Sequence, residues 1–397
     1  MAKNTHLEHL EDDIFNQGFA GAKNAIEFLK SLRDMLTTGS GGSNTKVTVK
    51  WDGAPAIICG TDPETGLFFV GNKSVFNKTT PKICYSHADI DHWYDGSLNQ
   101  IMKMCLDNLS KLPIQGVLQG DLLYTKTPPK VRMGGKDCYK FKPNTITYCV
   151  EAKTDMGKKV AASKIGIVFH TTYSGATLGE MSAGFGVDVS PMQGVKDVAV
   201  FSSSFQNVNG MANLTPAERN RLNNSIAVAQ RNLVAGKSFL NAIQDGRGSF
   251  AYTALFKIYF NQVIKSGRVP SNSAAMHKEF LAFVDMRYKA EIAKKKTDKA
   301  RGDWEKKRTE AIKYLNSNRS VMFSALSGFK NLIAAKEQVI NKLKKIQGVG
   351  TFLEDENGYR VTSPEGFVAI KDGTAMKLVD RLEFSRANFT VAKDWGK

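Results

Sequence analysis

The chain has 397 residues, with 55 lysines and arginines against 38 aspartates and glutamates, so its net charge is +17. Because 42% of the residues are apolar and 10% are aromatic, the chain can build cores, which excludes disorder as its main state. It has no apolar run long enough to span a membrane and no secretory signal, so we expect a cytoplasmic protein. The cysteines, Cys59, Cys84, Cys105, Cys138 and Cys149, form no Cys-x-x-Cys pair and are predicted to be reduced thiols.

Apolar spacing predicts a helical segment over Leu7–Leu36, followed by a flexible Gly/Ser connector at 39–43. From Lys46 to about Val200, short β-rich runs alternate with turn residues. These runs are Val47–Val49, Ala56–Cys59, Leu67–Val70, Val117–Leu123 and Ile165–Phe169. The same pattern resumes over Tyr359–Leu382.

The intervening segment, 215–346, has helical spacing and carries 26 lysines and arginines against 10 acids, so it holds nearly all the excess charge. Thr215-Pro216 is a typical helix start. We therefore expect an α+β fold in four parts: an N-terminal helical segment (1–43), a first core part (44–214), a basic all-α insertion (215–346) and a second core part (347–397).

The segment with the most chemical potential is Lys50-Trp51-Asp52-Gly53, which follows a predicted strand. A lysine is a nucleophile only when its amine is neutral, and a partly buried site near other cations and a metal favours that form. The alternative is an exposed strand-end cation followed by an ordinary turn, and four residues alone do not decide between them.

Lys-x-Asp-Gly is also the nucleotide-attaching motif of the covalent nucleotidyltransferase superfamily, which comprises ATP-dependent DNA ligases, RNA ligases and mRNA capping enzymes. The chain resembles this family at four further points in family order. They are Gly120-Asp121 for the third motif, Phe169-His170 for the next strand, Glu365-Gly366-Phe367-Val368 for the fourth motif, and Ala375-Met376-Lys377 for the fifth.

Several residues depart from the family pattern. Asp121 stands in place of Glu, His170 in place of Asp, and Ile370 and Val379 in place of lysines. The chain as a whole also resembles uncharacterised proteins of large tailed phages, through His6–Glu11 and Lys50–Ala56. That resemblance implies a bacteriophage origin and no activity.

The family resemblance implies a ligase-like nucleotidyltransferase fold, with ATP-grasp-like antiparallel sheets and helices. It also implies that Lys50 attacks the α-phosphate of ATP, while Lys377 neutralises the triphosphate. Asp121 and Glu365 would hold Mg²⁺, Asp121 alternatively the ribose hydroxyls, and Phe169 would stack on the base. Asp52, Gly53 and Lys73 would complete the ATP-binding site.

Each of these residues has a structural alternative. Phe169, in an alternating strand, is typical of a core residue. His170 is also consistent with a satisfied polar residue on the opposite face of the strand, and Glu365-Gly366 with a turn after Pro364.

For the insertion, we expect Lys294–Lys313 to lie in one helix whose mixed charges form either a solvated face or a phosphate-backbone contact. The aromatic residues Tyr252, Phe256, Tyr259 and Phe260 have the spacing of a helical core.

Three functional hypotheses follow. The first is an enzyme, an ATP- and Mg²⁺-dependent RNA or DNA ligase-like nucleotidyltransferase that forms lysyl-AMP on Lys50 and binds nucleic acid, with RNA favoured, through the 215–346 segment. The second is a catalytically degenerate nucleic-acid-binding phage protein. The third is a virion or packaging-associated structural protein. AMP transfer to a protein or small molecule is a further alternative.

Overall fold

The fold is that of a computed structural model, which describes residues 8–38, 45–133, 135–203, 213–246, 248–267, 272–344, 350–355, 358–361, 366–371 and 374–381. The chain divides into two compact units. A sheet unit comprises Met1–Leu7, Lys46–Met211 and Lys344–Lys377, and a helical unit comprises Glu8–Thr45, Ala212–Leu343 and Leu378–Lys397. The expected mixed α+β class is confirmed.

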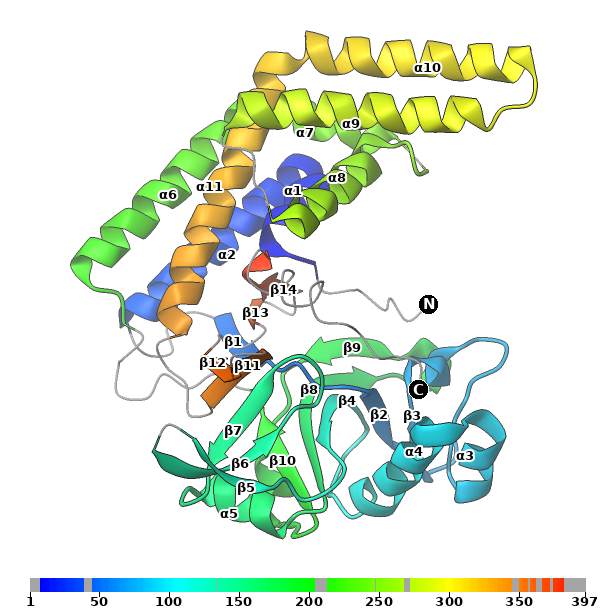
Figure 1. Ribbon diagram of the computed structural model, residues 1–397, viewed down its shortest axis with the longest axis vertical. Helices are drawn as coiled ribbons and strands as arrows, with labels where there is room; N and C mark the ends of the chain where they lie inside the picture. The colour runs from blue at the N-terminus through cyan, green and yellow to red at the C-terminus, as the bar shows by residue number, and fades with distance from the viewer. Residues whose placement is uncertain are drawn as a thin grey trace. The chain divides into compact units, whose positions relative to one another are not determined.

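Six strands of the sheet unit form one sheet in the order β10-β8-β4-β2-β3, with β9 paired to β8 (Figure 1). Its pairings are antiparallel except between β10 and β8. The strands are β2 (Ala56–Thr61), β3 (Phe68–Gly71), β4 (Val117–Tyr124), β8 (Ile165–Ser174), β9 (Ser182–Phe185) and β10 (Val198–Ser202). The β-rich runs predicted from 56 to 169 each overlap one of these strands.

The six-stranded sheet buries apolar side chains on both faces. On one face, Ile57 and Phe169 pack in a cluster with Cys105 of α4 (Gly96–Leu109), which follows α3 (His87–Trp93). On the other face, Ile58 and Tyr173 belong to a smaller cluster near the short helix η2 (Lys73–Phe76). Because successive side chains of a strand point to opposite faces, the residues of each strand are divided between the α4 face and the η2 face of the sheet.

A five-stranded antiparallel sheet has the order β12-β11-β7-β6-β5. Its strands are β5 (Lys130–Met133), β6 (Lys136–Phe141), β7 (Thr147–Glu151), β11 (Gly350–Asp355) and β12 (Gly358–Val361). Helix α5 (Asp155–Ala162) follows β7 and contacts β6 and β7. The sheet thus joins segments from both sides of the helical insertion.

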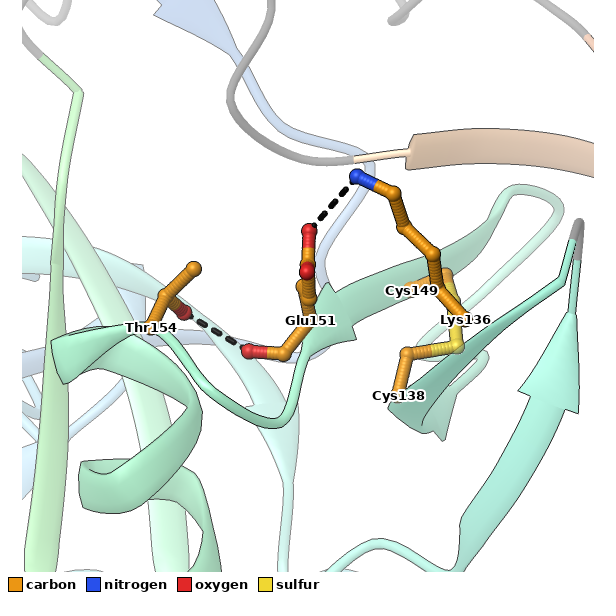
Figure 2. Close-up of a disulfide and its surroundings, with 5 residues drawn as sticks. All are labelled: Lys136, Cys138, Cys149, Glu151 and Thr154. Atoms are coloured by element: carbon orange, nitrogen blue, oxygen red, sulfur yellow. Dashed lines mark hydrogen bonds and ion pairs between the residues drawn. A yellow bond between two sulfur atoms is a disulfide. The ribbon is translucent and has the colours of Figure 1, made fainter.

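Cys138 on β6 and Cys149 on β7 form a disulfide (Figure 2). The prediction of reduced thiols is therefore wrong for this pair. The antiparallel register of the two strands makes these cysteines diagonal neighbours with Cα atoms 5.7 Å apart, which the sequence spacing did not reveal. Cys59, Cys84 and Cys105 are free and buried.

A three-stranded sheet, in the order β1-β13-β14, contains β1 (Thr45–Lys50), β13 (Gly366–Lys371) and β14 (Thr374–Leu378). It confirms the strands expected at Val47–Val49 and in the tail. Strand β13 pairs with β1 on one side and with β14 on the other, so this small sheet brings residues near the start of the chain next to residues near its end.

The helical unit contains the long helices of the N-terminal segment and of the insertion, together with shorter elements. They are η1 (Leu10–Asp12), α1 (Asp13–Asn16), α2 (Gly18–Thr38), α6 (Pro216–Ala235), α7 (Lys237–Ala242), η6 (Ile243–Asp245), α8 (Tyr252–Ser266), α9 (Ser273–Ala293), α10 (Asp298–Ser317) and α11 (Arg319–Leu343). Helix α2 packs against α6 and α11, so the N-terminal helices belong to the same unit as the insertion.

The predicted helix start at Thr215-Pro216 is confirmed. The Thr215 hydroxyl accepts a hydrogen bond from the Glu218 backbone N–H, and the Glu218 carboxylate accepts one from the Thr215 N–H, which is a capping box. The aromatic stripe of α8 is confirmed as core for Phe256, Tyr259 and Phe260, which are buried, whereas Tyr252 is half-buried.

The expectation of one helix over Lys294–Lys313 is wrong. Helix α9 ends at Ala293 and α10 begins at Asp298, so the lysines at 294–296 lie in the turn of a helical hairpin. Thr297 starts the new helix, because its hydroxyl accepts from the Ala300 N–H and so caps α10.

Buried charges connect the first described residues of the helical unit to α11 and to Arg381. Lys336 Nζ lies 2.7 Å from Glu11 Oε1, with both side chains almost wholly buried, and Arg381 donates to Asp12 at 2.8 Å. Burial raises the pKa of Asp12 to about 6.

Within the residues described, no helix combines the length and the apolar character that crossing a membrane needs.

Candidate functional site

The sheet unit contains a cavity of about 270 Å³ between the three-stranded sheet and the strands β4, β8 and β9. It is lined by Thr48, Val49, Lys50, Trp51, Lys73, Gln119, Asp121, Val168, His170, Thr171, Tyr173, Ala183, Phe185, Ser203, Val368, Ile370 and Lys377. These residues come from segments as far apart as β1 and β14, so only the fold assembles them.

Four of the residues selected from the sequence line this cavity: Lys50, Lys73, Asp121 and Lys377. Lys50 and Lys377 are half-buried, and Lys73 is exposed. Among the described lining residues, three lysines stand against one carboxylate, so this part of the site is positive. Such a site favours an anionic ligand.

The two half-buried lysines are placed by the three-stranded sheet. Lys50 is the last residue of β1 and Lys377 lies near the end of β14, with β13 between these strands. The two lysines are therefore on strands of the same sheet, although more than 300 residues separate them in the sequence.

Asp121 of β4 and His170 of β8 form the polar part of the cavity opposite this sheet. His170 Nε2 lies 3.5 Å from Asp121 Oδ2, and His170 Nδ1 lies 2.8 Å from Thr171 Oγ1. Both side chains of the His170–Asp121 pair are less than a third exposed. His170 is thus a polar residue with partners on the face of β8 opposite Phe169, and its side chain lines the cavity.

A β-bulge in β8 shapes this part of the cavity. Gly120 of β4 pairs with Phe169, but the preceding residue, Gln119, pairs with Thr171, so His170 is the extra residue. Beyond the bulge the parity of the cavity-lining residues changes, and Thr171 and Tyr173 face the cavity with Val168 and His170. Simple alternation along β8 does not predict this set.

Asp52 does not line the cavity but anchors the segment that carries Lys50. Its buried carboxylate accepts hydrogen bonds from the Thr145 and Ile146 backbone N–H groups at 2.7 and 2.9 Å and from the Asn144 amide at 2.8 Å. Its own N–H donates to Tyr148 Oη at 2.7 Å. Asp52 therefore fixes the end of β1 to the loop between β6 and β7.

Gly53 also lies outside the cavity lining, and it allows the backbone after Lys50 to pass close to β4. A Cβ atom at this position would lie 2.6 Å from Asp121 Cβ and 2.9 Å from Leu122 O. Only glycine therefore lets the chain after Lys50 run against β4, where the Ala54 N–H donates to Leu122 O at 2.9 Å.

Phe169 does not reach the cavity. Its side chain is wholly buried in the core cluster beside α4, on the face of β8 that holds Ile167. The base-stacking role implied by the resemblance thus has no geometric basis at this residue. Glu365 lies outside the described residues.

Sequence reasoning missed the aromatic and amide residues of the cavity: Trp51, Gln119, Tyr173 and Phe185. Tyr173 Oη donates to Gln119 Oε1 at 2.7 Å, and Trp51 stacks on Tyr148 with its ring centroid 4.8 Å away. Gln119 carried a usable signal, because it lies two residues from Asp121 on the same strand and so on the same face. Phe185 carried none, since β9 is a short strand rich in small residues.

The described lining residues offer few ligands for a magnesium ion. Asp121 supplies the carboxylate among the described lining residues, and no group of three or more His, Cys, Asp or Glu side chains suited to a metal occurs in the described ranges. Mg²⁺ in nucleotide sites typically takes one or two carboxylates and completes its coordination with phosphate oxygens and water.

Residues 4–393 match the model of a protein family described as a family of unknown function, DUF6267. The chain belongs to this family. The match includes the sheet unit and the helical unit, so both are parts of one family architecture. No curated protein and no solved structure matches the chain.

Proposed function

We propose that this DUF6267 protein is an ATP-dependent nucleotidyltransferase with a ligase-like fold, which adenylylates Lys50 and transfers the AMP to a nucleic acid end. The observation that carries the proposal is the meeting of Lys50, Asp121 and Lys377 in one cavity. The family resemblance predicted this set from three separate motifs.

The proposed reaction has three balanced steps. The Lys50 amine gives up a proton and attacks the α-phosphorus of ATP, so that a P–N bond forms and the P–O bond to pyrophosphate breaks. A 5′-phosphate oxygen of the nucleic acid then attacks the same phosphorus, which releases Lys50 and leaves AMP on the end. Finally, a 3′-hydroxyl attacks the activated 5′-phosphate and displaces AMP.

The cavity residues would contribute mainly charge and position, which dominate phosphoryl transfer. Lys377 and Lys73 would neutralise the triphosphate. Asp121 would share a Mg²⁺ ion with the phosphates, and when bound this ion would stabilise the charge on the leaving pyrophosphate. Trp51 and Phe185 offer apolar walls for a base, in place of Phe169.

The proposed partner is nucleic acid, with RNA favoured, held in part by the basic 215–346 segment. The proposed origin is a bacteriophage, and the proposed location is the cytoplasm of the infected cell. The Cys138–Cys149 disulfide stands against that location, because the cytosol keeps most thiols reduced.

Incubation with α-labelled ATP and Mg²⁺ tests the proposal. We expect the wild-type protein to carry a label that resists alkali and is released by acid, as a lysine phosphoramidate does, and we expect none on Lys50→Ala. Lys46→Ala is the matched control, because Lys46 lies on the same strand but is exposed and does not line the cavity. Equal labelling of wild type and Lys50→Ala would contradict the proposal.

A binding function without catalysis is the second candidate, and Ile370 is the observation that favours it. Its side chain lines the cavity where the family pattern has a lysine, and Val379, at the other departure, is buried. If this candidate is correct, the protein binds ATP or nucleic acid but acquires no covalent label.

A further inference from the structure

The sheet unit contains a short segment with a high positive charge, although the net charge summed over all residues outside 215–346 is close to zero. Residues 126–159 contain nine lysines and arginines against three acids. This segment forms the β5–β6 hairpin, strand β7 and most of α5. The basic insertion is therefore not the only cationic region.

The cations of the β5–β6 hairpin are exposed and outnumber their acidic partners. The side chains of Lys130, Arg132 and Lys136 are 55%, 75% and 68% exposed. Lys130 and Arg132 share a single acid, Asp137, at 3.3 and 3.8 Å, and Lys136 lies 2.8 Å from Glu151 (Figure 2). Exposed pairs of this kind are weak, so the hairpin keeps a positive potential that a polyanion can use.

The hairpin is also stiffly connected to the cavity. The Cys138–Cys149 disulfide joins β6 to β7, and the loop between these strands donates the three hydrogen bonds that hold Asp52. Asp52 lies two residues from Lys50. A ligand held by the hairpin is therefore held in a fixed relation to the cavity within the same unit.

We propose that the β5–β6 hairpin, with Lys130, Arg132 and Lys136, binds the phosphate backbone of the nucleic acid whose end receives AMP. The identity of this partner rests on the proposed function, but the binding itself does not require adenylylation. Transfer to an end needs the acceptor to be held by the unit that carries Lys50, and the hairpin is an exposed basic element of that unit.

Cations on β5 have another possible role, because positive side chains on an edge strand discourage pairing with other chains. That role accounts for Lys130 and Arg132, but Lys136 lies on β6, which is paired on both sides. It also predicts no effect of these residues on nucleic acid binding, so one experiment separates the two roles.

The test is a full-length triple variant with Lys130→Glu, Arg132→Glu and Lys136→Glu. The matched control is Lys111→Glu, Lys164→Glu and Lys196→Glu. These control residues are exposed, belong to the same unit, and include two lysines that share one acid, Asp197, as the hairpin cations share Asp137. Both variants change the net charge equally.

The measurement is fluorescence anisotropy without ATP, with a 5′-phosphorylated single-stranded RNA and the DNA of the same sequence, between about 50 and 200 mM salt. We expect the hairpin variant to bind about tenfold more weakly than the control, with a salt dependence shallower by about two units in log–log slope. RNA and DNA arms that fall together indicate a pure phosphate contact, and a larger loss with RNA indicates that the 2′-hydroxyl is also read. Either pattern supports the proposal.

Equal affinities and equal salt slopes for the two triple variants would overturn the proposal. α-Labelled ATP is used separately on the hairpin variant, which retains the cavity residues and should keep the wild-type label. Loss of nucleic acid binding with label retained supports the hairpin as acceptor surface. Absence of label in every protein, including wild type, defeats the proposed function while leaving the binding result valid.

Discussion

The anchor formed by Asp52 can be tested by the Asp52→Ala substitution. This change removes three hydrogen bonds to a charged acceptor and leaves the Thr145 and Ile146 N–H groups buried without their partner. Hydrogen bonds to charged groups contribute about 1.5–3 kcal/mol each, and partial replacement by water reduces the sum to about 3–5 kcal/mol. Since domains are stable by only about 5–15 kcal/mol, the loss is severe.

The assay is thermal unfolding followed by circular dichroism. For a unit of this size, the expected destabilisation lowers the melting temperature of the sheet unit by about 10 °C. Below that temperature, Asp52→Ala should also lose lysine labelling, because the end of β1 is no longer fixed.

The matched control is Asp188→Ala. Asp188 belongs to the same unit, but it is exposed and accepts one backbone hydrogen bond, from the Ser190 N–H at 2.9 Å. Its loss should cost under about 1 kcal/mol. Similar melting temperatures for the Asp52 and Asp188 variants would refute the role of Asp52 as an anchor.

Three further predictions concern other parts of the molecule. Gly53→Ala should destabilise the sheet unit and abolish labelling, because its Cβ would lie 2.6 Å from a side chain of β4, whereas Gly194→Ala, with no atom within 4 Å, should melt like wild type. Burial lowers the pKa of His277, so the unfolded chain binds the extra proton more readily and the histidine contributes less stability as pH drops below about 6.5. The stability difference between wild type and His277→Gln should therefore change between pH 7 and pH 5 to the disadvantage of wild type, whereas the raised pKa of Asp12 acts on both proteins alike. Reduction of Cys138–Cys149, whose sequence separation is 11, should lower stability by about 2–3 kcal/mol in urea unfolding, and a variant with both cysteines changed to serine should not respond to reductant.

Much of the local structure was readable from the sequence because it depends on neighbouring residues. The Thr215-Pro216 start of α6, the buried stripe of α8 and most strand positions follow from caps and periodicity, which act over a few residues. The error at 294–297 has the same local basis. There, α9 ends at Ala293 and the Thr297 cap starts α10, within a run of residues whose charges alone suit a single helix.

The disulfide and the bulge could not be read in this way. Cys138 and Cys149 meet because of the register of two strands, and His170 enters the cavity because β8 holds one residue more than its partner at that point. Register is set by the packing of whole sheets and is not encoded at either residue alone.

By itself, the sequence determined the mixed class of the chain, the helical character of its basic segment and Lys50 as the candidate nucleophile. The tertiary structure decided which residues surround that lysine: it placed Lys377 and Asp121, which the family resemblance had implied, in the same cavity, left Phe169 in the core, and gave Asp52 an anchoring role. The reason is physical. Helix caps and alternation act between near neighbours, whereas a cavity forms only where strands distant in sequence pair and their faces are packed together.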